Sequence, residues 1–324
     1  MIYISLEQEF SRELPFYLAM EEYVAKCLNV NEAFFMWQVE PSVIFGRNQL
    51  IEKEVNLLYC KEHNISTYRR KSGGGCVYAD KGNIMFSYIS DNYNVKNAYD
   101  SYLNKVISAL NKLGVNAEST GRNDIVIDKK KISGSAFYHV NGKSVVHGTM
   151  LFDTNMENMI NAITPATTKL KSKGVESVRS RITTLNKYLN INIDEFKHSI
   201  KTLLCNDVIV LNKLAINEIE KLEQLYLNEN FIYGKNPHFN IENNLRIEGV
   251  GDFKALIEVN KGIIKNINIM GDYFLNEEID AALFESLKGI AYKEESIRKK
   301  IDTINIGDII LNMSNEQFVK LLIN

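Results

Sequence analysis

Short strand-like runs joined by tight turns fill the middle of the chain, and they restrict its fold more than any other feature. Asn141 and Gly142 separate two such runs, and both residue types tolerate positive φ, which favours a two-residue hairpin. The sequence combines strands, helices and hairpins and has no run of βαβ units, so it predicts an α+β fold with mixed sheets flanked by helices. Strands are expected at 1–6, 33–39, 42–45, 65–68, 83–89, 124–127, 131–138 and 144–152.

Apolar residues recur at helical spacing between these strands. One helix is expected at 97–113, where five apolar residues share a face that we predict to be buried, and Gly114 then ends it. The five residues are Tyr99, Leu103, Val106, Leu110 and Leu113. Other helices are expected at 11–28, 54–63, near 156, at 194–204 and at 215–226.

A polar stretch at 234–238 precedes a second set of elements. Strands are expected after it at 245–249, 254–260 and 262–270, and helices at 277–287 and 315–322. A chain of 324 residues is long enough for two domains. We therefore expect a catalytic domain at 1–240 and a small α+β accessory domain at 241–324.

The formal net charge of −2 provides no broad basic surface, so nucleic acid is not an expected partner. The four cysteines form no CxxC pair, which indicates reduced thiols, and the five histidines lack the spacing of a zinc site. Neither a signal peptide nor an apolar run of about 20 residues is present in the sequence. We expect a cytoplasmic protein without a membrane partner.

The string RRKSGGGCVY, from Arg69 to Tyr78, is the first candidate site. Three glycines allow a ligand to approach the backbone closely and leave N–H groups for an anion. The preceding cations can neutralise phosphate oxygens. The alternative is a flexible turn beside a solvated basic run. The glycines fit neither GxGxxG nor GxxxxGK[ST], so a Rossmann fold and a P-loop are not supported.

The string KKKISGSAF contains Lys131 at an expected strand start, followed by small residues. Its ammonium group could offset charge that develops in acyl transfer, although a charged turn before a strand is the plainer interpretation. Asp124 could bind Mg²⁺ or cap a turn, and His147 could border an active site or be structural.

Together, RRKSGGGCVY, GRNDI, KISGSAF, HGTMLFD and KGVESVRSRITTL resemble the lipoate–protein ligase A family in order and spacing. The resemblance covers most of residues 40–185, and the tail resembles the accessory carboxy-terminal domain of that family more loosely. Biotin ligases share the general fold but carry a GRGRxG-type loop. Cys76 and Ala79 stand where the family usually has Ala and His, and the second difference removes a polar side chain near the nucleotide loop.

The resemblance implies roles for particular residues. Lys131 would be the catalytic residue and contact both the carbonyl of the acid and the α-phosphate, and Asp124 would lie in the wall of the active site. ATP would be held by Arg70, Gly75, Cys76, Val77, Tyr78 and Lys131. Lipoate would be held by Ser72, Gly73, Gly74, Lys131, Ser135 and His147.

The implied enzyme activates lipoate with Mg·ATP and transfers the lipoyl group from lipoyl-AMP to a lysine of a carrier domain. The carriers would be E2 subunits of 2-oxoacid dehydrogenases or the glycine-cleavage H protein. One alternative is an ATP-independent lipoyl or octanoyl transferase that uses a cysteine thioester. Such enzymes of one class have a PCG-like segment, where this chain has Thr164-Pro165-Ala166. The other alternative is a non-catalytic lipoyl-binding protein, which the presence of Arg70 and Lys131 argues against. Without a sustained apolar heptad, we expect a monomer.

Overall fold

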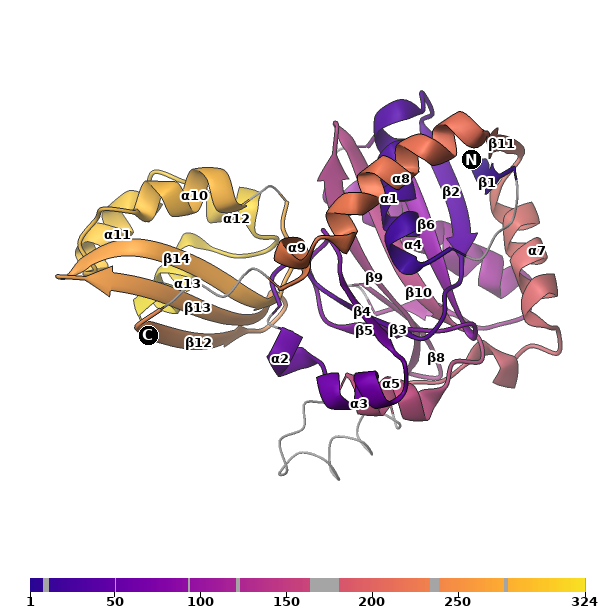
Figure 1. The fold of residues 1–324 in the computed structure, drawn as a ribbon, viewed down its shortest axis with the longest axis horizontal. Coiled ribbons are helices and arrows are strands. Elements are labelled where there is room, and N and C mark those ends of the chain that lie inside the picture. Colours follow the sequence, from indigo (N-terminus) through magenta and orange to yellow (C-terminus); the bar gives the residue numbers. More distant parts are fainter. Residues whose placement is uncertain are drawn as a thin grey trace. The chain divides into compact units, whose positions relative to one another are not determined.

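The computed structural model describes residues 1–7, 12–49, 51–92, 94–120, 123–163, 181–233, 239–276 and 279–323 (Figure 1). The chain forms two compact units. The first unit comprises residues 1–45, 52–70 and 76–232, and the second unit comprises residues 46–51, 71–75 and 233–324. The polar stretch at 234–238 lies outside the described residues.

An eight-stranded mixed sheet is the centre of the first unit, with strand order β11-β1-β2-β6-β10-β9-β8-β7. Strand β1 is parallel to both of its neighbours, and the other neighbouring strands are antiparallel. The strands are β1 (Ile2–Leu6), β2 (Glu32–Trp37), β6 (Asn83–Ser90), β7 (Glu118–Ser119), β8 (Asp124–Ile127), β9 (Lys130–Val140), β10 (Lys143–Leu151) and β11 (Asp207–Leu211). A smaller sheet contains β4 (Ser66–Arg69), β3 (Ser42–Phe45) and β5 (Val77–Ala79), in that order.

Two hairpin turns bring the central candidate residues together. Asn141 and Gly142 have φ values of 51° and 75°, which confirms the predicted turn between β9 and β10. Asp128 and Lys129 have φ values of 49° and 62° and turn the chain from β8 into β9. This second turn puts Lys131 at the beginning of β9 and opposite β8.

Helices cover both faces of the large sheet. Buried residues of α1 and α8 pack with those of β2, β6, β9 and β10 on one face. On the other face, Tyr99 of α4 contacts Phe137 of β9, with 5.4 Å between ring centroids. The helices up to residue 233 are α1 (Leu14–Cys27), α2 (Ile51–Glu54), α3 (Leu57–Glu62), α4 (Val95–Lys112), α5 (Met156–Ala162), the 3₁₀ helix η1 (Leu185–Lys187), α7 (Ile193–Leu204), α8 (Lys213–Leu227) and α9 (Glu229–Tyr233).

The helix predicted at 54–63 is confirmed as α3, but it begins three residues later, at Leu57, and the separate short helix α2 ends at Glu54. The Asn56 side chain accepts a hydrogen bond from the Tyr59 N–H and so caps a new helix at Leu57. The sequence patterns also missed β5 and β11. Within the described ranges, β11 pairs with β1 alone, and β1 lies at the other end of the first unit in the sequence, so no local hairpin signal marks β11.

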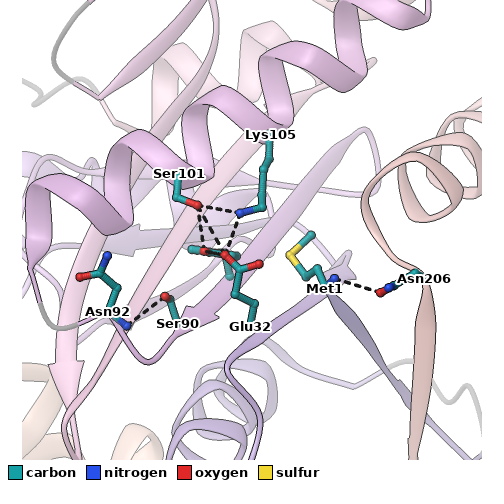
Figure 2. Close-up of polar contacts among 8 residues, drawn as sticks. Met1, Glu32, Ser90, Asn92, Ser101, Lys105 and Asn206 are labelled. Carbon is teal, nitrogen blue, oxygen red and sulfur yellow. Dashed lines mark hydrogen bonds and ion pairs between the residues drawn. The ribbon is translucent and has the colours of Figure 1, made fainter.

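A polar cluster of four residues joins α4 to the sheet (Figure 2). Lys105 Nζ lies 2.7 Å from Glu32 Oε1 and 2.7 Å from Ser101 Oγ, and the Tyr88 hydroxyl donates to Glu32. Glu32 belongs to β2 and Tyr88 to β6, whereas Ser101 and Lys105 belong to α4. The cluster therefore fixes the helix to two neighbouring strands.

Glu32→Gln should destabilise the protein at pH 7 by about 0.5–1 kcal/mol, since the ion pair is partly exposed to solvent. Burial opposes ionisation of Glu32, yet hydrogen bonds from Lys105 and Tyr88 lower its pKa overall. The ion pair therefore stabilises the fold fully above the unfolded pKa of about 4.3, and this contribution is lost as the pH falls through the folded pKa.

Urea unfolding of the wild type and of Glu32→Gln at pH 7 and at lower pH measures this dependence. The matched control is Glu40→Gln, which removes the more exposed pair with Lys81. An identical loss of stability between the two pH values in wild type and Glu32→Gln would contradict the prediction.

In the second unit, three antiparallel strands form a sheet in sequence order, and helices pack against it. The strands are β12 (Ile241–Ile247), β13 (Gly251–Asn260) and β14 (Ile263–Asp272), and the helices are α10 (Ile279–Leu287), α11 (Glu294–Ile301), α12 (Ile306–Ile309) and α13 (Asn315–Ile323). Their core includes Ile257, Ile269, Leu283 and Phe318. The α+β fold class is confirmed. None of the helices among the described residues has the length and apolar character to cross a membrane.

Candidate functional site

Lys131 is held beside Asp124 at the hairpin between β8 and β9. Its Nζ lies 2.8 Å from Asp124 Oδ1, and its side chain is 38% exposed. A Cβ on Gly134 would lie 2.5 Å from Lys131 Nζ and 3.4 Å from Asp124 Oδ1. The absence of a side chain at Gly134 therefore leaves room for this ammonium group, which remains accessible to a ligand from solvent.

The hydroxyl of Tyr99, on α4, brings three candidate residues into one neighbourhood. The pKa of the Tyr99 hydroxyl is raised overall, mainly because burial disfavours its charged form. A hydrogen bond with Ser135 and the positive charge of Arg70 lower this pKa, and the negative charge of Asp124 raises it. Arg70, Ser135 and Asp124 therefore all act electrostatically on one buried phenol. The helical pattern assigned Tyr99 only to the core, and its polar atom among aliphatic neighbours was the signal for a second role.

Arg70 is anchored at the end of β3. Its backbone N–H donates to the Phe45 carbonyl at 3.1 Å, and Nη1 donates to the Ile44 carbonyl at 3.0 Å. The preceding Arg69 points elsewhere: its Nε donates to the Ile232 carbonyl at 2.9 Å, and its guanidinium lies over the Phe45 ring. Both arginines were predicted to bind phosphate. In the structure, Arg69 has a structural role, and Arg70 acts electrostatically on Tyr99.

The glycine segment lies in the second unit and contacts the end of β14. Gly74 N–H donates to the Tyr273 carbonyl at 2.9 Å, so this amide does not point at an anion as expected from the sequence. A Cβ on Gly73 would lie only 2.2 Å from the same oxygen, and one on Gly75 would lie 3.3 Å from Asp272 Oδ2. The sequence analysis did not associate Asp272 and Tyr273 with the glycines.

Neighbouring backbone contacts fix the same segment. The Ser72 side chain is fully buried, and its carbonyl accepts a hydrogen bond from the Arg47 N–H at 2.9 Å. The Gly271 N–H donates to the Asn48 carbonyl at 3.0 Å. Ser72, Gly73 and Gly74 are therefore positioned by backbone hydrogen bonds and close packing.

Residues Cys76 to Tyr78 continue from this segment into β5, back in the first unit. Burial raises the pKa of the Cys76 thiol, and the nearby charge of Arg70 only partly offsets this. Burial also raises the pKa of Tyr78 to about 12. Val77 pairs with Ile44 of β3. Burial therefore disfavours the thiolate form of Cys76 in the proposed nucleotide segment.

His147 belongs to a buried polar network on the α1 face of the sheet. Its Nδ1 lies 2.9 Å from Oε2 of Glu21, which is fully buried. Glu21 also accepts hydrogen bonds from the hydroxyls of Ser87 at 2.6 Å and Tyr138 at 3.3 Å. Glu21 was missed by sequence reasoning, although a glutamate pair within an otherwise apolar stretch of α1 is a usable signal.

The sheet separates two of the predicted lipoate-binding residues. His147 pairs directly with Ala136, so the neighbouring Ser135 side chain points to the opposite face. On that face Ser135 lies next to Gly148, and a Cβ on Gly148 would lie 2.7 Å from the Tyr102 hydroxyl of α4. The structure therefore groups Ser135 with Tyr99 and Arg70, and His147 with Glu21.

Asp124 is an isolated carboxylate with respect to metal binding. No group of three or more His, Cys, Asp or Glu side chains suited to a metal ion occurs within the described ranges. Mg²⁺ is commonly held by one or two carboxylates together with substrate phosphates, and Asp124 offers one carboxylate, for which the Lys131 ammonium group competes. Its assignment to Mg²⁺ stays a prediction.

Two candidate stretches lie partly outside the described residues, at Gly121 and Arg122 of GRNDI and at residues 173–180 of KGVESVRSRITTL, and Thr164-Pro165-Ala166 lies wholly outside them. In the first unit, the candidate site residues described above belong to β3, β5, β8, β9, β10, α1 and α4, and the glycine segment is described separately with the second unit.

Comparison with known proteins identifies the family. The family described as the lipoyl protein ligase A/B catalytic domain matches residues 14–204, and the bacterial lipoate protein ligase C-terminus matches residues 236–322. Lipoate–protein ligase 1 of Staphylococcus aureus is 35% identical over 314 residues, covering 94% of this chain and 95% of the relative.

Solved structures agree in fold. The crystal structure of P. falciparum LipL1 in complex with lipoate has a TM-score of 0.78 at 25% identity and covers 100% of this chain and 98% of that chain. A lipoate–protein ligase A bound with ATP has a TM-score of 0.62 at 23% identity and covers 72% of this chain and 98% of that chain. With both domain families and a full-length relative matched, this chain belongs to the lipoate–protein ligase family.

Proposed function

We propose that this protein activates lipoate with ATP and transfers the lipoyl group from lipoyl-AMP to a lysine of a lipoyl carrier domain. The observation that carries the proposal is the Lys131 ammonium, held 2.8 Å from Asp124 and still partly exposed, at the start of KISGSA. The family relationship supports the substrates, since one structural relative contains lipoate and another contains ATP.

In the first step, a lipoate carboxylate oxygen attacks the α-phosphorus of ATP, an O–P bond forms, and pyrophosphate leaves. Negative charge increases on the phosphoryl oxygens, and Lys131 is placed to offset it. Arg70, whose guanidinium is held by the Ile44 carbonyl, supplies a second cation. When bound beside Asp124, Mg²⁺ would neutralise phosphate charge.

In the second step, the amine of a carrier lysine attacks the carbonyl carbon of the mixed anhydride. An amide bond forms, the bond between that carbon and the AMP oxygen breaks, and the amine loses a proton. Catalysis depends mainly on positioning, because the anhydride is already activated. We propose E2 subunits of 2-oxoacid dehydrogenases or the glycine-cleavage H protein as carriers, and a monomer acting in the cytoplasm.

Lipoate-dependent exchange of labelled pyrophosphate into ATP tests the proposal. A ligase catalyses this exchange without a carrier, whereas an ATP-independent transferase or a non-catalytic binding protein does not. Absence of exchange by folded protein supplied with Mg²⁺ would exclude the proposed function.

Cys76→Ala should retain most ATP-dependent ligation. Burial raises the pKa of this thiol, so little nucleophilic thiolate exists at neutral pH. The exposed Cys27 should react with iodoacetamide first and serves as the internal comparison. Mass spectrometry of the wild type after incubation with an acyl donor provides the check. An acyl-thioester on Cys76, together with loss of activity in Cys76→Ala, would instead indicate a transferase.

We propose a catalytic domain at 1–240 and an accessory domain at 241–324, with the tail supporting the first half-reaction. Ending the chain at residue 240 removes two backbone hydrogen bonds. One runs from the Gly74 N–H to the Tyr273 carbonyl, and the other runs from the Gly271 N–H to the Asn48 carbonyl. Lipoyl-AMP formation should therefore fall much more than transfer from supplied lipoyl-AMP. Both half-reactions are measured in the truncated and full-length chains, and an equal loss would contradict the proposal.

A further inference from the structure

Two neighbouring glutamates are buried in the first unit, and neither takes part in the reaction steps proposed above. Glu21 is fully buried and Glu22 is 2% exposed, although both lie in α1 among apolar residues. A carboxylate is costly to bury unless neighbouring groups donate hydrogen bonds to it. The partners of these two carboxylates show that both belong to one connected group of polar side chains.

The inner half of this group connects the large sheet to Glu21. His147 Nδ1 lies 2.9 Å from Glu21 Oε2, and the Tyr138 hydroxyl lies 3.3 Å from the same oxygen. Glu21 also accepts a hydrogen bond from Ser87, so its oxygens act as acceptors, and the proton shared with His147 belongs to the ring nitrogen. Glu21 therefore joins the His147 imidazole to the Tyr138 phenol.

The outer half of the group connects Tyr138 to the surface. Burial and the charge of Glu22 raise the pKa of Tyr226, and a hydrogen bond with Tyr138 lowers it. The Tyr226 hydroxyl donates to Glu22 Oε1 at 2.5 Å, and Glu22 Oε2 lies 2.8 Å from Lys26 Nζ. The Lys26 side chain is 38% exposed. A continuous chain of polar contacts therefore leads from His147 to solvent.

His147 lies beside the residues that surround the Lys131 ammonium group. Thr149 Oγ1 accepts a hydrogen bond from the Gly134 N–H at 3.1 Å, and a Cβ on Gly134 would lie 2.5 Å from Lys131 Nζ. His147 precedes Thr149 by two residues in β10, so their side chains share one face and their Cα atoms are about 7 Å apart. The inner end of the chain is therefore next to the proposed place of the anhydride.

We propose that this chain is the exit route for the proton that the carrier lysine loses during lipoyl transfer; the proposal rests on the proposed function. As the amine attacks, one of its N–H bonds breaks and an N–H bond forms at the His147 imidazole, whose Nδ1 proton passes to Glu21. Each tyrosine hydroxyl then accepts one proton and gives up another. Glu22 becomes protonated and returns the proton to water through Lys26.

Tyr138→Phe and Tyr226→Phe each remove one hydroxyl and interrupt the chain. Single-turnover transfer from supplied lipoyl-AMP to an apo E2 lipoyl domain should fall by about 10²-fold, the lower end of the contribution of a positioned proton acceptor. Lipoate-dependent pyrophosphate exchange should stay within a few-fold of wild type, because formation of lipoyl-AMP from a carboxylate releases no proton. Both half-reactions are first measured in the wild type, where failure of the proposed function would be recognised.

Tyr88→Phe is the matched control, because the Tyr88 hydroxyl also belongs to a buried tyrosine and donates to a glutamate, Glu32, outside the chain. This variant should transfer at a near wild-type rate. Imidazole buffer of rising concentration should accelerate transfer by Tyr226→Phe and leave the wild type unchanged, since a diffusible base replaces the interrupted route. A hydroxyl that only supports packing would give no such rescue.

Glu22→Gln is a further test, because it keeps the shape of the side chain but cannot pass a proton between its two oxygens. It should lose transfer and keep exchange, as the two phenylalanine variants should. Three results in variants that are folded by thermal unfolding would overturn the proposal: wild-type transfer by both phenylalanine variants, equal losses of exchange and transfer, or slow transfer that imidazole does not relieve.

Discussion

Replacing Lys131 with alanine should lower the rate of lipoyl-AMP formation by about 10²–10³-fold, the effect of removing one preorganised charge-stabilising donor. Lys131 is a partly exposed residue at the start of β9, so its loss should change packing little. The substitution also removes the ion-pair partner of Asp124. The potential at the proposed phosphate site then becomes more negative, which disfavours phosphate binding. The rate is measured as lipoate-dependent pyrophosphate exchange at saturating ATP.

Lys130→Ala is the matched control, because Lys130 is the adjacent, exposed lysine of the same strand. It should retain near wild-type exchange. Thermal unfolding of both variants establishes that each is folded. Near-normal lipoyl-AMP synthesis by Lys131→Ala would show that this lysine does not stabilise the reacting groups.

Gly73→Ala should reduce lipoyl-AMP formation by about 10²-fold, since a displacement of about 1 Å in a positioning segment has effects of this size. The new Cβ would lie 2.2 Å from the Tyr273 carbonyl oxygen, and the obstacle is backbone that cannot rotate away. The glycine segment must therefore move or lose the hydrogen bond from Gly74 to the same oxygen.

Gly75→Ala tests this reasoning two residues away. Its Cβ would lie 3.3 Å from Asp272 Oδ2, a side-chain atom that can move by rotation. Neither Gly73 nor Gly75 has φ in the left-handed region, so both substitutions are compatible with the local backbone. Gly75→Ala should retain activity within a few-fold. Equal rates for the two variants would mean that the contact with Tyr273 does not position the segment.

The local elements were accessible from the sequence because their signals are local. Asn141-Gly142 specifies a hairpin through its own allowed φ values, and the structure has the expected left-handed conformations there. The amphipathic pattern at 97–113 likewise matches α4 (Val95–Lys112) within two residues at its start. Where a capping residue sets the boundary, as Asn56 does, the predicted helix begins too early.

The sequence by itself determined the α+β class, the main hairpin, most helices and the strings that identify the family. Only the tertiary structure paired His147 with Glu21, which is 126 positions away, and placed Ser135 and His147 on opposite faces of one sheet. It alone brought the Tyr273 carbonyl to the glycine segment. Backbone preferences and periodicity act over a few residues, whereas the partner of a buried polar group depends on strand order and register across the whole sheet.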